Sequence, residues 1–145
     1  MTTRILFVCL GNICRSPAAE GVMRHIAPDL ELDSAGTSDW HVGEAPYAPM
    51  QSAARARGYD LSALRARQFR GQDFADFDLI VAMDRANLTK IEAMRPTGAE
   101  TPVVLFAEYT EGWDMSEVPD PYYTRDFNGV LDLIEAAAQG LLARL

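Results

Sequence analysis

The sequence predicts an α/β fold in which one parallel sheet of four strands carries helices on both faces, giving three layers. Short apolar runs alternate with amphipathic segments along the chain, a pattern typical of βαβ crossovers. A length of 145 residues fits one domain, and 48% hydrophobic with 23% charged residues is ordinary for a globular protein. We therefore expect residues 1–145 to form a single domain.

The first half of the chain begins with a strand, a loop and a helix. Residues 5–8 are a continuous apolar run, typical of a strand covered on both faces. A helix is predicted to begin at Pro17 behind a Ser16 cap and to stop before Pro28. Residues 30–35 alternate between apolar and polar side chains, which indicates a second strand.

The second half of the chain repeats this alternation. A helix is predicted over residues 48–57, and 77–83 has the pattern of a buried third strand. A helix over 85–94 leads to a fourth strand at 103–106, and an apolar stripe from 127 to 145 predicts the last helix. Since the carboxyl ends of parallel strands share one edge of the sheet, the loops after them should hold the functional site.

The net charge of the chain disfavours some kinds of binding partner. The chain carries 13 lysines and arginines against 21 aspartates and glutamates, a net charge of −8, which disfavours nucleic acid and anionic membranes. No stretch approaches the roughly 18 apolar residues of a membrane span, and the short apolar start lacks a signal-peptide cleavage site. We therefore expect a cytoplasmic protein. The charges are unevenly spread, because residues 108–120 hold five acids and no base.

The loop between the first strand and the first helix has the character of a phosphate-binding loop. Backbone N–H groups and a helix N-terminus favour an anion there. Cys9 stands at the entry of the loop and Arg15 at its exit. The nearby positive charge favours the thiolate form of Cys9, and Arg15 can hold two phosphoryl oxygens. Attack of the sulfur on phosphorus would then form a phosphocysteine.

Other residues complete this chemistry. Ser16, besides capping the helix, is placed to donate its hydroxyl to the sulfur, and Asn12 suits a left-handed turn in the loop. Asp120, between two prolines, is the candidate general acid for the leaving group and then the base for hydrolysis of the phosphocysteine. His25 and His41 are interpreted as isolated histidines, so neither a metal site nor a cofactor is expected.

Four segments together resemble the low molecular weight protein tyrosine phosphatases: Cys9–Pro17, Asp33–Thr37, Ala82–Asp84 and Asp120–Tyr123. The resemblance covers essentially the whole chain in the right order. It implies the fold of that family, a flavodoxin-like or Rossmann-like variant described as phosphotyrosine protein phosphatase I-like. It also implies hydrolysis of phosphotyrosine and small aryl phosphates.

The resemblance assigns expected roles residue by residue. Cys9 would be the nucleophile, Arg15 the phosphate ligand and Asp120 the general acid, and the phosphate would also contact Leu10, Gly11, Asn12, Ile13, Cys14 and Ser16. Together with Asn12, the loop would be supported by Ser34 and Asp84. The cleft would be walled by Trp40, Tyr122 and Tyr123, the two tyrosines also being candidate phosphorylation targets. Cys14 matches a cysteine that forms a reversible disulfide with the nucleophile in the family.

Three alternatives stay open at this point. A protein arginine phosphatase would resemble this family, but those enzymes have a threonine where Ile13 stands, and an apolar side chain favours an aromatic ring. A thioredoxin-coupled arsenate reductase needs distal cysteines, and none follows Cys14. A non-catalytic phosphate-binding module would not need both the thiol and the acid.

The expected partner is a phosphotyrosine-containing protein, for which a tyrosine kinase is a candidate by resemblance, and neither a nucleic acid nor a membrane. The protein is expected to be a monomer or a weak dimer. A group of arginines is interpreted as a solvated basic face: Arg55, Arg57, Arg65, Arg67 and Arg70.

Overall fold

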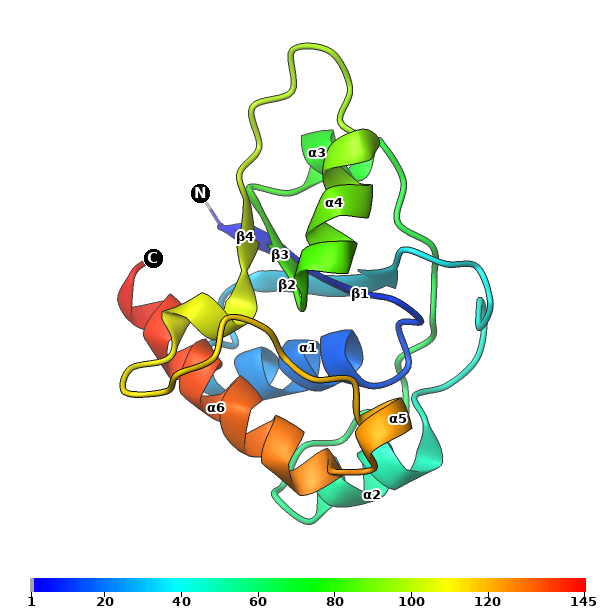
Figure 1. The fold of residues 1–145 in the computed structure, drawn as a ribbon, viewed down its shortest axis with the longest axis vertical. Coiled ribbons are helices and arrows are strands. Elements are labelled where there is room, and N and C mark those ends of the chain that lie inside the picture. Colours follow the sequence, from blue (N-terminus) through cyan, green and yellow to red (C-terminus); the bar gives the residue numbers. More distant parts are fainter. Residues whose placement is uncertain (1) are drawn as a thin grey trace.

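The computed structural model describes residues 2–145 and contains one sheet of four parallel strands in the order β2-β1-β3-β4 (Figure 1). The strands are β1 Arg4–Cys9, β2 Glu31–Gly36, β3 Leu79–Ala82 and β4 Val103–Leu105. The predicted four-stranded parallel sheet is thereby confirmed. β3 begins two residues later than predicted because Phe77 ends a short helix, and β4 stops at Leu105 because Phe106 begins a turn of 3₁₀-helix.

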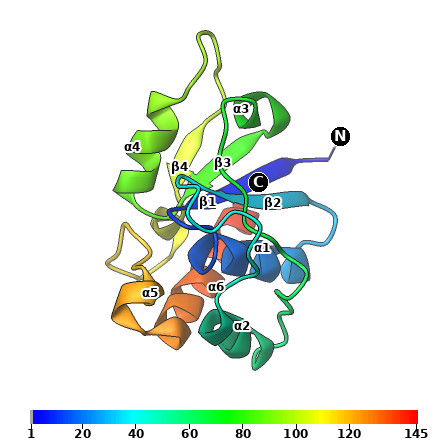
Figure 2. The ribbon, with the colours of Figure 1, turned by 90° about the vertical axis from the view of Figure 1, so that its right-hand side faces the viewer.

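Helices cover both faces of the sheet, as predicted (Figures 1 and 2). One face carries α1 Arg15–Ile26, α2 Ala48–Arg55 and α6 Phe127–Ala143; the other carries α3 Asp73–Asp76 and α4 Arg85–Ala93. Two short elements join β4 to α6: η1 Phe106–Tyr109 and α5 Pro121–Thr124. None of α3, η1 and α5 was predicted, because a single turn is too short to show helical periodicity. Across residues 2–145, no helix has the length and apolar character to span a membrane.

The central strand β1 is buried on both sides, which explains its continuous apolar run. Alternate side chains point to opposite faces of a strand, so that Phe7 packs toward α1 and α6 while Leu6 and Val8 pack toward α3 and α4. The Phe7 ring lies 5.3 Å from the ring of Phe106. Complete burial of such side chains stabilises the fold by about 1.5–3 kcal/mol each. The loop that follows Cys9 therefore starts from a firmly held strand.

The interpretation of the five arginines as a solvated face is wrong for two of them. Arg57 forms ion pairs with Asp132 and Glu135 of α6. Arg67 forms ion pairs with Asp33 and with Asp73, whose side chain is fully buried. These two arginines tie separate segments together, because acids distant in the chain fold against them.

Candidate active site

The loop after β1 turns sharply and leads directly into α1. Asn12 has a φ of 57°, so the predicted left-handed turn is confirmed. The helix begins at Arg15, earlier than predicted, and Ser16 is not its cap. The residue at the N-cap position is Cys14, and no side chain caps this end. The first N–H groups of a helix lack partners within it, so those of α1 are available to an anion.

Two polar groups contact the sulfur of Cys9, and this residue is 3% exposed. The hydroxyl oxygen of Ser16 lies 3.0 Å from Sγ, which is the predicted contact. The backbone N–H of Asn12 also donates to Sγ over 3.2 Å. The loop thus directs a backbone N–H group, and the first turn of α1 directs a hydroxyl group, at the sulfur.

A chain of hydrogen bonds holds the loop in shape. The Asn12 amide donates to the hydroxyl of Ser16 over 2.8 Å and to that of Ser34 over 3.0 Å, and its oxygen accepts from the backbone N–H of Arg67. Ser34 in turn donates to a carboxylate oxygen of Glu20 over 2.8 Å. Burial raises the pKa of Glu20, although the Ser34 hydrogen bond opposes the shift. Ser34 therefore lies where loop support was predicted.

Glu20 was missed by the sequence analysis. It lies on α1 beside the buried Ala19 and is itself 3% exposed. The available signal was its position on the apolar face of that helix, where an acid needs a partner. Its two partners are Ser34 and Arg24, which is one helical turn further along α1.

The guanidinium of Arg15 is held from two distant segments. One nitrogen donates to Asp84 over 2.7 Å and to the carbonyl of Val118 over 3.0 Å, and the other lies 3.4 Å from an oxygen of Asp120. Burial opposes charge on this group, but interactions with Cys9, Asp84 and Asp120 outweigh it and raise the pKa of Arg15. Arg15 is therefore a permanent cation with a set orientation. Asp84 acts on Arg15 rather than on the loop backbone.

These groups line one pocket of about 210 Å³. Its walls include the thiol of Cys9, the guanidinium of Arg15, Asp120 and the loop residues Leu10, Gly11, Ile13 and Cys14. The predicted wall residues are also present at the pocket: Trp40, Tyr122 and Tyr123. Trp40 and Tyr123 are largely exposed and Tyr122 is partly exposed, and the Tyr122 and Tyr123 rings lie 5.4 Å apart. The geometry suits an aromatic group held above a phosphate.

His41 also lines this pocket, a position that the sequence analysis did not predict. Its Nδ1 atom lies 3.0 Å from a carboxylate oxygen of Glu44. A side-chain carbon at Gly11 would lie 3.1 Å from the imidazole, which shows how closely His41 approaches the loop. The signal in the sequence was its place next to Trp40, in the loop that follows the second strand at the same sheet edge.

Cys14 differs from Cys9 in its environment. It is 3% exposed and lines the same pocket, and both cysteines are free thiols. Burial, and secondly the neighbouring Cys9, raise the pKa of the Cys14 thiol to about 12. At neutral pH Cys14 is therefore a protonated thiol.

A group able to attack phosphorus and groups able to bind a phosphate dianion share one cavity at the carboxyl edge of a parallel sheet. This arrangement defines the class of cysteine-dependent phosphoric monoester hydrolases. The chain belongs to the low molecular weight phosphotyrosine protein phosphatase family, whose family model matches residues 4–145. The resemblance stated from the sequence is thereby confirmed.

Individual relatives agree along nearly their whole length. The low molecular weight protein-tyrosine-phosphatase YfkJ of Bacillus subtilis is 40% identical, over 97% of this chain and 94% of that protein. The low molecular weight protein-tyrosine-phosphatase of Streptomyces coelicolor is 43% identical, over 99% of this chain and 93% of that protein. The crystal structure of YfkJ superimposes with a TM-score of 0.91, covering 99% of this chain and 94% of that one. The structure of a protein tyrosine phosphatase from Entamoeba histolytica, which is 35% identical, also superimposes with a TM-score of 0.91, covering 99% of this chain and 96% of that one.

Proposed function

We propose that this protein hydrolyses phosphotyrosine in proteins, and small aryl phosphates, through a phosphocysteine formed on Cys9. The observation that carries the proposal is the convergence of the Cys9 thiol, the Arg15 guanidinium and Asp120 on one pocket. A further support is the apolar side chain of Ile13 in the pocket wall, which suits contact with the tyrosine ring.

The first chemical step transfers the phosphoryl group to sulfur. The phosphate dianion binds to Arg15 and to the backbone N–H groups of the loop. The thiolate of Cys9 attacks phosphorus in line as the bond to the phenolic oxygen breaks, and protonated Asp120 gives its proton to that oxygen. The products of this step are tyrosine and phosphocysteine.

The second step restores the enzyme. The carboxylate of Asp120 takes a proton from water as the water oxygen attacks phosphorus and the phosphorus–sulfur bond breaks. Inorganic phosphate is released and Cys9 returns as a thiolate. Ser16 stabilises the sulfur as it leaves, from the 3.0 Å position of its hydroxyl.

The test is hydrolysis of para-nitrophenyl phosphate by the purified protein in the presence of a chelator. We expect Cys9→Ser to lower kcat by about a thousandfold or more, while inorganic phosphate still raises its thermal unfolding temperature. Rapid quenching of the parent with a radiolabelled substrate should trap one phosphoryl group on Cys9. Full activity in Cys9→Ser would overturn the proposal.

We also propose that Cys14 protects Cys9 from irreversible oxidation. Peroxide would oxidise the Cys9 thiolate to a sulfenic acid, and the thiol of Cys14 would then displace water to form a disulfide. Its support is that both thiols line one pocket. Peptide mapping after peroxide should find a Cys9–Cys14 disulfide that dithiothreitol reduces. Recovery of over-oxidised Cys9 alone would count against this role.

We further propose that residues 1–145 form one domain and that the protein works as a monomer or weak dimer. We also propose that its partner is a phosphotyrosine-bearing protein, for example a tyrosine kinase. The exposed rim at Trp40 and Tyr123 leaves the pocket open to a protein surface. Catalysis by a free thiol suits the reducing cytoplasm. A single cooperative unfolding transition would support one domain. Sedimentation measured over a series of protein concentrations tests the oligomeric state. Capture of phosphoproteins by the Asp120→Ala variant tests the partner.

A further inference from the structure

A groove beside the active site has no part in the chemistry described above. It encloses about 330 Å³ between the segment before α5 and the first turns of α6. We call it the flanking groove; its apolar walls are Trp113, Met115, Pro119, Val130 and Leu133. Trp113 and Met115 are 41% and 39% exposed, so two large apolar side chains of one short segment face solvent together. Grouped exposure of this kind marks interaction sites.

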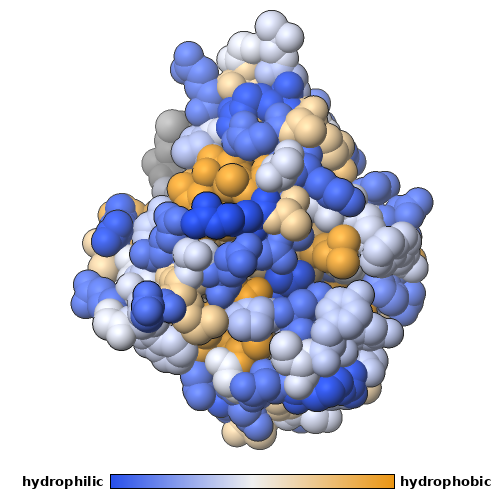
Figure 3. All heavy atoms as spheres, viewed as in Figure 1, coloured by the Kyte–Doolittle hydropathy of each residue, from blue (hydrophilic) through white to orange (hydrophobic). Residues whose placement is uncertain are grey.

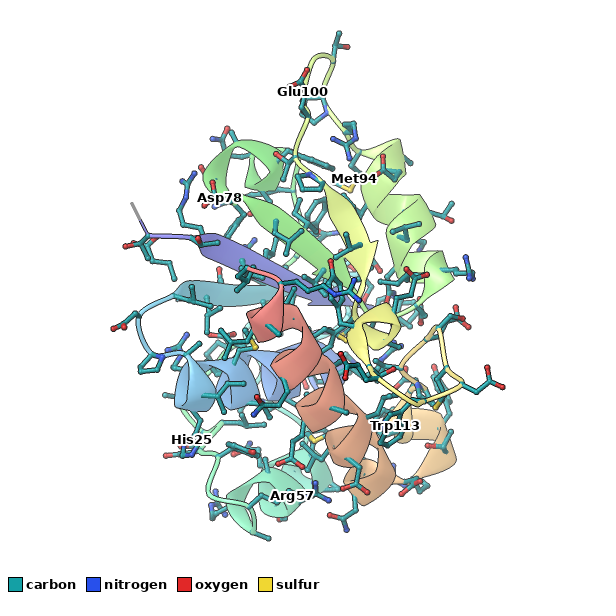
Figure 4. All side chains as sticks on the ribbon, turned by 90° about the vertical axis from the view of Figure 1, so that its left-hand side faces the viewer. His25, Arg57, Asp78, Met94, Glu100 and Trp113 are labelled. Carbon is teal, nitrogen blue, oxygen red and sulfur yellow. The ribbon has the colours of Figure 1, made fainter. Side chains whose placement is uncertain are left out.

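The flanking groove is related to the active-site pocket through residues that line a second hollow. This hollow has a volume of about 460 Å³. It shares Met115 and Pro119 with the flanking groove and Asp120 with the active-site pocket. The segment from Met115 to Asp120 therefore contributes lining residues to all three hollows. Figure 4 shows Trp113 on the segment between η1 and α5, next to α6.

The same segment is strongly negative. Residues 108–120 contain five acids and no lysine, arginine or histidine. Asp120 faces Arg15, but within residues 2–145 no ion pair involves the other four, Glu108, Glu111, Asp114 and Glu117. Asp132, which also lines the flanking groove, forms an ion pair with Arg57. The face that this segment crosses is mostly hydrophilic with small hydrophobic patches between (Figures 1 and 3).

We propose that the flanking groove binds the part of the protein substrate that lies next to the phosphotyrosine, and that it selects lysine or arginine together with apolar residues there. The four acids without ion pairs lie on the same segment as Trp113 and attract cations to it, two of them, Asp114 and Glu117, from the wall of the second hollow. Trp113 and Met115 offer apolar contact, and the Trp113 ring offers a face for a guanidinium. The inference rests on the proposed function, because it places the phosphotyrosine in the active-site pocket. It assigns substrate selection to a surface outside that pocket.

The first experiment compares three phosphotyrosine peptides that differ only in their flanking residues. One carries lysine, arginine and leucine, one carries serine and alanine, and one carries glutamate and leucine. At low salt we expect kcat/KM for the basic peptide to exceed that for the acidic peptide by about tenfold, from two or three exposed charge contacts. The difference should shrink in high salt, because exposed charges are screened.

The second experiment uses variants, with para-nitrophenyl phosphate as the substrate that cannot reach the groove. The quantity measured is the ratio of kcat/KM for the basic peptide to kcat/KM for the aryl phosphate. Trp113→Ala should lower this ratio about tenfold, as expected for an aromatic anchor, and Asp114→Asn about twofold to fivefold. Met94→Ala and Glu100→Gln are matched controls on a distant part of the surface (Figure 4) and should leave the ratio within about twofold.

The outcomes separate the two proposals. Equal rates for the three peptides, a preference for the acidic one, or a ratio in Trp113→Ala that matches the controls would overturn the role of the flanking groove. Each of these leaves aryl phosphate hydrolysis intact. Absence of aryl phosphate hydrolysis in the parent protein would instead overturn the proposed function.

Discussion

Asp120 uses its two carboxylate oxygens differently. One accepts the backbone N–H of Tyr122 over 3.1 Å and caps α5, and the other faces the guanidinium of Arg15. The cap holds the side chain at the pocket that Asp120 lines. In the proposed mechanism one residue therefore both caps α5 and transfers the proton.

Replacement of Asp120 by asparagine should separate these roles, because an amide keeps the cap but cannot give a proton. We expect kcat/KM for phenyl phosphate, which has a poor leaving group, to fall by about 10²–10⁴-fold. Hydrolysis of an activated ester such as dinitrophenyl phosphate should fall much less. An unchanged dependence of the rate on leaving-group pKa would remove Asp120 from this step.

Cys14 offers a second test at the residue scale. With a pKa of about 12, only about one part in ten thousand of its thiol is ionised at pH 8, and the thiolate is the reactive form. Iodoacetamide at pH 8 should therefore modify Cys9 and leave Cys14 unmodified in the folded protein. Mass mapping after a brief reaction gives the ratio of modified Cys9 to modified Cys14. Unfolded protein serves as the control, in which both cysteines react.

At the scale of elements, the contact between β2 and the phosphate loop depends on Gly36. The strand register places Gly36 beside Cys9, and a side-chain carbon there would lie 2.9 Å from the carbonyl oxygen of Leu10. Backbone N–H groups of the residues after Gly36 also donate to the loop, from Thr37 to Cys9 and from Ser38 to Leu10. The loop is thus shaped by the end of the neighbouring strand.

Gly36→Ala should displace the loop, since the atom it meets belongs to the backbone. We expect kcat/KM for aryl phosphate to fall by about 10²-fold and the free energy of unfolding by about 1–3 kcal/mol. Gly71→Ala is the matched control, because an added carbon there meets atoms only at 3.7 Å and beyond. Wild-type kinetics in Gly36→Ala would show that the loop is not set by this contact.

The long helix α6 begins with a cap that can be tested independently of catalysis. Asp126 accepts the backbone N–H of Gly129 over 2.9 Å. Asp126→Ala should lower the free energy of unfolding in urea by about 1 kcal/mol, and Asp126→Asn should retain most of the stability. An equal loss in both variants would point to the charge rather than to the cap.

At the scale of the whole molecule, Glu20 links the stability of the fold to pH. Its pKa is raised in the folded protein from an ordinary value of 4.5, mainly by burial. A carboxyl of this kind favours folding fully at pH values below its unfolded pKa, and the contribution is lost as pH rises through the folded value. The two carboxylate oxygens of Glu20 contact Ser34 and Arg24.

Glu20→Gln should therefore change how the free energy of unfolding depends on pH. Relative to the parent, the variant should become more stable as pH rises above about 4.5, because the amide has no charge to bury. Chemical denaturation over pH 4 to 7 measures the difference. A difference that is flat with pH, or of opposite slope, would contradict the raised pKa. Glu92→Gln, at an exposed acid on α4, is the control.

Several features were predictable because their signals are local. The apolar runs of β1 and β3, the stripe of α6 and the left-handed turn at Asn12 follow from neighbouring residues. The start of α1 was placed two residues late and Ser16 was taken for its cap, because the turn of the loop lets Arg15 and Ser16 enter the helix and directs the hydroxyl to Cys9.

The sequence by itself determined the alternation of strands and helices, the phosphate loop with its thiol and arginine, and the family. Only the tertiary structure decided that Asp84 and the carbonyl of Val118 hold Arg15, that Glu20 ends the hydrogen-bond chain from the loop, and that His41 lines the pocket. The physical reason is the separation in sequence over which each kind of interaction acts. Periodicity and turn chemistry act between residues a few positions apart, whereas these contacts arise when the sheet order brings the carboxyl ends of separate strands together.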